Sequence, residues 1–220
     1  RNADKKYDFD GSIYFPQLSM DDFTPVLSSY GITIPDILQT IKLEGKVNVE
    51  KTSTSYQATL NLNSKNTDEI TISASATSKN NKHDVLISRF HIKENILSAI
   101  NNITKLPNEV LRLGTVDARG RLTAEGDVMH PTQITVDADA QASRIGSVDM
   151  NGAYKNDYLK LSIKTPNLNL NEITKKSLGK VVCDLNIGAD IIQKDEIYDV
   201  RAITVEGKIP AITIQERIYR

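Results

Sequence analysis

The chain has 220 residues, of which 27 are basic and 28 acidic, so its net charge at pH 7 is −1. Charges of both signs are interspersed along the sequence, which argues against a nucleic-acid-binding protein, because such proteins carry a basic excess or a basic run. Aromatic residues make up only 5% and tryptophan is absent, so the core has to be built from Ile, Leu, Val and Ala.

The chain starts at Arg1 without a methionine or an apolar leader, and we expect it to be an internal segment of a longer protein. No stretch reaches the roughly 18 apolar residues of a membrane-spanning helix, so we expect any anchor to lie outside this segment. The single cysteine, Cys183, is expected to pack as a small apolar residue. A nucleophilic role for it would need a histidine and a positioning group within reach.

The first predicted elements are a strand near residues 8–14 and two short helices. One helix is predicted to begin after Ser19, because a serine with an acid three residues later is typical of a helix N-terminus. It is predicted to end before Gly31, since glycine is the preferred residue just past a helix C-terminus. The second helix is predicted over Pro35–Ile41, with its proline in the first turn.

Two further segments have helical character. The clearer one runs from Asn95 to about Lys105, where apolar residues form one stripe and Pro107 cannot continue the helix. The stripe consists of Ile96, Leu97, Ile100 and Ile103. A weaker helical turn is predicted near Leu170–Lys176.

Most of the remaining sequence alternates between apolar and polar residues. The alternation is clearest over residues 58–63, 70–77, 116–124, 134–143 and 181–188. Successive side chains of a strand point to opposite faces, so each run predicts a strand with one apolar side. Asn, Asp, Gly, Ser and Pro separate several of these runs. We therefore predict a mainly β fold, a twisted antiparallel sheet of about ten or more strands whose apolar sets share the concave side.

Similar segments recur at about 75-residue intervals. In each, a strand leads into a helix-like stretch and then into a leucine, a turn and a glycine-containing strand. The predicted unit is one helix followed by about four strands. We treat residues 1–220 as one continuous β domain, with units at roughly 13–85, 86–160 and 161–220.

The residues that could carry chemistry do not form a recognisable site. His83, His91 and His130 match no metal-binding or nucleophile motif, and we expect them to be solvated. Acids cluster weakly, with Asp137 and Asp139 on the polar side of one strand, but calcium would need five or more convergent oxygens. We therefore expect a solvated polar face, and a protein that is not an enzyme and has no metal or cofactor.

Two joints between the predicted units resemble a known family. Leu106-Pro107-Asn108-Glu109, followed by Leu113-Gly114-Thr115-Val116, resembles the repeated joint of TamB/AsmA-like proteins of the bacterial cell envelope. Asn167-Leu168-Asn169-Leu170, followed by Leu178-Gly179-Lys180-Val181, resembles the next joint. The segment from Met20 to Leu27 is similar to an equivalent unit upstream, although Leu43-Glu44-Gly45 departs from the expected Leu-Gly.

This resemblance implies a long, half-open β groove, a β-taco, with short helices at the joints. Members are periplasmic segments of proteins held in the inner membrane by an N-terminal helix, and they meet an Omp85-type outer-membrane barrel. Their apolar lining is thought to conduct phospholipid acyl chains between the membranes, in lipid transport, or to hold nascent outer-membrane β-strands during outer-membrane protein assembly and secretion.

On this interpretation the apolar residues of the alternating runs line the groove. The expected lining residues are Leu60, Leu62, Ile70, Ile72, Ala74, Val116, Ala118, Leu122, Ile134, Val136, Ala138, Ala140, Val181, Leu185 and Ile187. The alternative is a structural scaffold that binds a protein partner by edge-strand pairing, with edges near residues 8–14 and 211–218. An apolar face left open favours the groove, and one closed by the chain's own side chains favours the scaffold.

Overall fold

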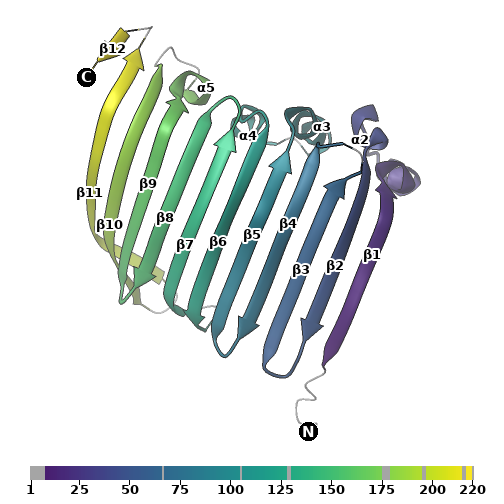
Figure 1. Ribbon diagram of the computed structural model, residues 1–220, viewed down its shortest axis with the longest axis horizontal. Helices are drawn as coiled ribbons and strands as arrows, with labels where there is room; N and C mark the ends of the chain where they lie inside the picture. Colours follow the sequence, from purple (N-terminus) through teal and green to yellow (C-terminus); the bar gives the residue numbers. More distant parts are fainter. Residues whose placement is uncertain are drawn as a thin grey trace.

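The computed structural model describes residues 8–65, 67–104, 106–127, 130–174, 179–194, 197–214 and 217–219. Within these residues the chain forms one antiparallel sheet of twelve strands whose spatial order follows the sequence order (Figure 1). The sheet is twisted and not closed, and it carries a few short helices. The predicted fold class is therefore confirmed.

Eleven of these strands are 10 to 18 residues long, well above the usual five or six. The twelfth, at the C-terminal edge, has three residues. The strands are β1 (Phe9–Ser19), β2 (Lys42–Lys51), β3 (Ser55–Ser64), β4 (Ile70–Lys79), β5 (Lys82–Ile92), β6 (Val116–Gly126), β7 (Pro131–Ala142), β8 (Gly146–Lys155), β9 (Tyr158–Asn169), β10 (Lys180–Lys194), β11 (Ile197–Ile214) and β12 (Arg217–Tyr219).

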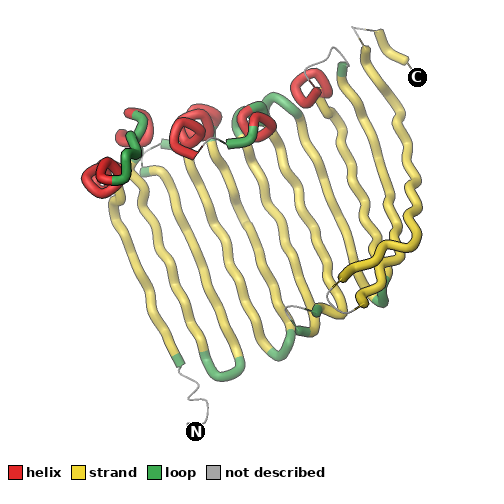
Figure 2. Tube along the Cα trace, turned by 180° about the vertical axis from the view of Figure 1, so that it is seen from behind, coloured by secondary structure: helices red, strands yellow, loops and turns green. Residues whose placement is uncertain are grey.

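The helices all lie along one end of the strands (Figure 2). Between β1 and β2 lie the 3-10 helix η1 (Met20–Phe23), α1 (Thr24–Ser29) and α2 (Asp36–Thr40); between β5 and β6 lie α3 (Glu94–Thr104) and α4 (Asn108–Leu111); α5 (Leu170–Thr174) lies between β9 and β10. The three groups begin 74 and 76 residues apart and enclose two sets of four strands. This is the spacing that the sequence repeat predicts.

The opposite end of the sheet has only short connections, of two to four residues. Two of them place both central residues in the left-handed region, Asn80 and Asn81 at φ 51° and 57°, and Asn156 and Asp157 at φ 51° and 61°. These are the dihedral signs of a type I′ turn, whose twist matches that of the flanking strands. Asn and Asp tolerate this backbone better than other residues with a side chain, which explains why tight hairpins form there.

The first helical group begins and ends as the sequence predicts. Ser19 accepts a hydrogen bond from the Asp21 N–H, and the Asp22 carboxylate accepts one from the Ser19 N–H at 3.0 Å, so aspartate completes the capping box. Gly31, at φ 73°, donates to the Ser28 carbonyl, and the Ile32 N–H donates to the Leu27 carbonyl. This is a Schellman ending.

Proline explains where the helices differ from expectation. The predicted single helix after Ser19 is divided into η1 and α1, and Pro25 occupies the first turn of α1, where its missing N–H costs nothing. Pro107 was expected only to end a helix, but it also serves as the N-cap residue of α4, with φ −53°. Residue 105 of the helix predicted from Asn95 and residues 175–176 of the helical turn predicted near Leu170–Lys176 lie outside the described residues.

A small core forms where the helices meet the sheet. Ile34, Leu38 and Ile41, around α2, pack with Ile96 and Ala99 of α3. Leu43, Ile70 and Ile92 of the strands lie against this cluster. Of the predicted α3 stripe, Ile96 and Leu97 are buried and Ile100 and Ile103 are partly buried. The helices therefore cover only the adjoining end of the sheet.

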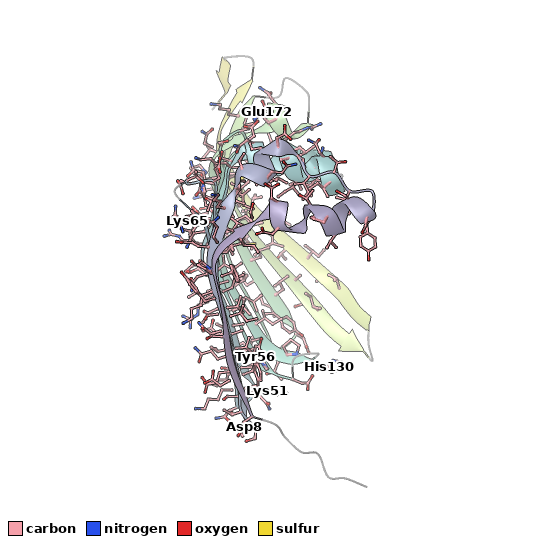
Figure 3. All side chains as sticks on the ribbon, turned by 90° about the vertical axis from the view of Figure 1, so that its right-hand side faces the viewer. Asp8, Lys51, Tyr56, Lys65, His130 and Glu172 are labelled. Carbon is pink, nitrogen blue, oxygen red and sulfur yellow. The ribbon has the colours of Figure 1, made fainter. Side chains whose placement is uncertain are left out.

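Seen edge-on, the helices and the curved C-terminal strands lie on the same side of the sheet (Figure 3). Register shifts interrupt several ladders, among them those between Phe15 and Leu18 in β1 and between Ile87 and Phe90 in β5. Such bulges bend a strand and increase its twist. We call the helix-bearing side the concave face and the other side the convex face.

The C-terminal edge differs from the prediction of one strand over residues 211–218. β11 is much longer, from Ile197 to Ile214, and β12 is a separate strand that pairs back on it, with Ile212 opposite Tyr219. Residues 215–216 lie outside the described residues. The sheet edge is therefore formed mainly by β11.

Candidate functional site: the concave face

The strand registers bring apolar residues from neighbouring strands into continuous rows across the concave face. In an antiparallel pair, directly opposed residues share a face, so each row can be followed through the Cα partners. One row runs through Val47, Leu60, Ala74, Ile87, Gly120, Ala138 and Met150. The bulge in β5 adds one residue between Ile87 and Phe90, and these two residues still face consecutive row positions on β6, Gly120 and Ala118, so the rows stay in phase across it.

All fifteen residues predicted to line a groove lie on this concave face. They come from β3, β4, β6, β7 and β10 and are brought together by the ladders. Two of them are covered within the chain: Ile70 packs against the helical core, and Val181 is buried.

Sequence reasoning missed other residues of the same face. Val47 and Val49 on β2 and Leu159, Leu161 and Ile163 on β9 alternate as clearly as the predicted runs, so the same signal could have found them. In β5 the bulge separates Ile87 from Phe90 by three positions, and Leu86 lies on the convex face. A strict period of two therefore hides the apolar side of β5.

The middle of the concave face is open to solvent. Val85, Ile87 and Leu122 are 41%, 39% and 42% exposed, and Ile203 and Val205 on β11 are 65% and 62% exposed. A shallow depression of about 340 Å³ lies over β2–β5, and its lining includes Val47, Val49, Tyr56, Leu60, Ala74 and Val85. Large apolar patches of this kind mark binding surfaces in soluble proteins.

The convex face is polar and carries most of the ion pairs of the described chain. The Arg121 guanidinium binds both carboxylate oxygens of Asp84, at 2.9 and 2.5 Å, and Arg119 binds Asp139 at 2.5 Å. The hydrogen bonds from Arg121 lower the pKa of the Asp84 carboxyl, and the bond to Asp139 raises the pKa of Arg119. All four side chains remain partly exposed.

His91 corrects one expectation. It is not solvated but buried on the convex side, where its Nδ1 lies 2.6 Å from an Asp117 carboxylate oxygen and its Nε2 lies 3.1 Å from the Asp68 carbonyl. The histidine thereby links the β3–β4 loop to β5 and β6. A polar residue is tolerated at this buried position because both ring nitrogens have partners.

The other candidate residues are not assembled into a site. Cys183 is a free, partly buried thiol on the concave face, with Thr165 as its cross-strand partner. Asp139 is paired with Arg119, and no three His, Cys, Asp or Glu side chains of the described residues are grouped as metal ligands would be.

No family model, curated protein or solved structure matches this chain. Each helix in the described part of the chain is too short or too polar to cross a lipid bilayer.

Proposed function

We propose that the concave face is a lipid-binding trough and that this chain is a non-enzymatic, periplasmic segment of a TamB/AsmA-like envelope protein. The trough would take phospholipid acyl chains on their way between the inner and outer membranes, or nascent outer-membrane strands. The observation that carries the proposal is the row structure of the concave face, apolar across strand after strand and open in its middle.

The chemistry of the lining favours a conduit over an ordinary ligand pocket. A small-molecule site combines apolar walls with a few convergent polar anchors. Across β2–β9 the middle rows of the concave face carry only Ala, Gly, Val, Ile, Leu, Met and Phe. An acyl chain would be sheltered from water there without a fixed stopping point.

The local structure of the joints supports the family assignment. Gly114 and Gly179, the glycines of the two similar motifs, both have left-handed backbones, at φ 73° and 82°, two residues before β6 and one residue before β10, respectively. A left-handed residue at this position favours glycine. Gly45 of the divergent first joint instead lies inside β2 beneath the Phe15 ring. The inner-membrane anchor and the Omp85-type barrel partner belong to the same proposal.

Bound lipid is the first test of this proposal. Protein purified without added detergent should release phospholipid that mass spectrometry detects. A photo-crosslinking amino acid at Leu122, exposed on the concave face, should label lipid, whereas the same probe at Asn61, exposed on the convex face of β3, should not. Equal labelling from the two faces would contradict the trough.

A charge in the trough provides the second arm of the test. Leu122→Asp or Ala138→Asp would place a carboxylate among acyl chains, where it is not compensated, so lipid crosslinking from a neighbouring position should fall. The matched control is Asn61→Asp on the convex face, and circular dichroism checks that each variant keeps its strands. Unchanged crosslinking in the two concave variants would count against the proposal.

A specific observation also favours the scaffold alternative. Within the described chain β1 pairs only with β2, and β11 pairs on its outer side with β12 over Ile212–Ile214 alone. Unpaired strand edges can add a strand from a protein partner. The two functions use different surfaces, because edge pairing employs backbone groups and the trough employs side chains.

A further inference from the structure

The two ends of the concave face differ in chemistry. At one end the helices cover the sheet with the apolar cluster around Ile34, Leu38 and Ile96. At the hairpin end the row across β2–β5 consists of Lys51, Tyr56, Ser78 and His83, which are consecutive cross-strand partners. The row continues into Phe9 of β1 on one side and Ala124 of β6 on the other. We call the four residues on β2–β5 the polar row. At about 4.8 Å between strands, it spans about 14 Å.

Two residues of the polar row face solvent, whereas Ser78 and His83 are half-buried and His83 Nε2 lies 3.1 Å from the Gly126 carbonyl oxygen. Lys51 and Tyr56 are exposed, and neither the ammonium nor the phenol makes a hydrogen bond or ion pair with a described residue. The two residues are direct cross-strand partners near the hairpin end of the sheet (Figure 3). Directly opposed side chains have Cβ atoms about 5 Å apart, so both groups can reach one anion.

The concave face of β2–β9 carries a positive charge and no negative charge among the described strand residues. Over β2–β9, the described strand residues on this face include no Asp or Glu, and Lys51 is the only Lys or Arg. Carboxylates of the same strands, such as Glu50 and Asp84, lie on the convex face. The polar row is therefore complementary to a negative group, which no acid on its own face would repel.

The polar row also adjoins the apolar depression over β2–β5. Tyr56 belongs both to the row and to the lining of the 340 Å³ depression, which continues through Val49, Leu60 and Val85 toward the helices. The side chain of Tyr56 therefore lies beside the apolar residues of the depression, and Tyr56 is directly opposite Lys51 on the neighbouring strand. An acyl chain in the depression and the head group of the same lipid at the polar row would therefore be adjacent.

We propose that the trough binds anionic phospholipids in one orientation, with the head group at the polar row and the acyl chains directed toward the helix end. This inference rests on the proposed lipid-binding function and adds to it the charge and the polarity of the ligand. It assigns the head group to the hairpin end, where Lys51 supplies the charge and Tyr56 and Ser78 supply donors.

The test compares two probes with the same tail on intact protein freed of lipid. Lysophosphatidylglycerol is the anionic probe and an alkyl maltoside is the neutral one, each titrated below its micelle concentration by calorimetry. Lys51→Gln should weaken binding of the anionic probe by about two- to fivefold, the range of an exposed charge contact, and leave maltoside binding unchanged. Tyr56→Phe keeps the ring and removes the hydroxyl, and combined with Lys51→Gln it should weaken binding of the anionic probe further.

Lys46→Gln is the matched control, since Lys46 lies on the same strand but on the convex face, and it should change neither affinity. If Lys51→Gln weakened the binding of both probes to the same extent, or weakened neither, the oriented binding would be overturned. The trough itself would remain supported. Failure of the unaltered protein to bind either probe would overturn the proposed function and this inference together.

Discussion

At the scale of single residues, cross-strand geometry determines which charges meet on the convex face. Arg119 lies directly opposite Asp139, whereas Arg121 lies opposite Leu86 on β5 and reaches Asp84 two residues further along. Both direct and diagonal neighbours of an antiparallel pair are within reach of a long side chain. The Arg121–Asp84 contact uses both carboxylate oxygens, the geometry in which guanidinium binds most specifically.

This contact predicts a pH-dependent part of the stability. Because the pKa of Asp84 in the folded chain is lower than its ordinary value of 3.8, the pair stabilises the fold above that value and loses its contribution as the pH falls through the lower folded pKa. Asp84→Asn should therefore reduce stability at pH 7 and make little difference near pH 2. The effect should be small, since the pair is partly exposed.

Urea unfolding at a series of pH values checks this difference. Asp10→Asn is the control, because Asp10 also lies on the convex face and forms no ion pair within the described chain. If the free energies of unfolding of Asp84→Asn and of the unaltered protein differ by the same amount at pH 2 and pH 7, the ion pair is not the cause of that difference.

At the scale of elements, local chemistry explains what the sequence predicted and what it did not. Two signals lie within single elements, and the structure contains the elements that they predict. These signals are the alternation along β3, β4, β6, β7 and β10 and the apolar stripe of α3. The β5 side chains could not be assigned to faces, because a bulge changes the phase of alternation and only the neighbouring strands determine it. The burial of His91 likewise depends on Asp68 and Asp117, which come from other elements.

The α3 helix supports a prediction of its own. Ile96 of α3 is fully buried and packs with the residues around α2 and at the ends of the strands. Ile96→Ala would therefore leave a cavity and lower the free energy of unfolding by about 3 kcal/mol. Ser98→Ala, at an exposed position of the same helix, should change it very little. Chemical denaturation measures both; equal small effects would mean that the helix is not a packed part of the fold.

At the scale of the whole molecule, the sheet has one buried end, one open middle and two edges. The helices shelter the apolar face only near Leu43, Ile70 and Ile92, and within the described chain no second layer covers the rest. The open middle follows from the absence of a facing sheet, and sequence patterns could not reveal it, since an alternating strand looks the same whether its apolar side meets protein or lipid.

The edges lead to the last prediction, which concerns association. Among the described residues the outer edge of β1 is unpaired over eleven residues, and Ile13 and Tyr14 on this strand are 67% and 64% exposed. Such an edge can pair with another chain. The apparent mass of the isolated chain should therefore rise with concentration in light-scattering measurements. Tyr14→Lys, which places a charge on this edge but on the convex face, should reduce association without altering the trough. Thr59→Lys puts the same charge on the interior strand β3 and should have no effect. A strict monomer at every concentration, or equal dissociation by the two lysines, would exclude pairing through β1 and weaken the scaffold alternative.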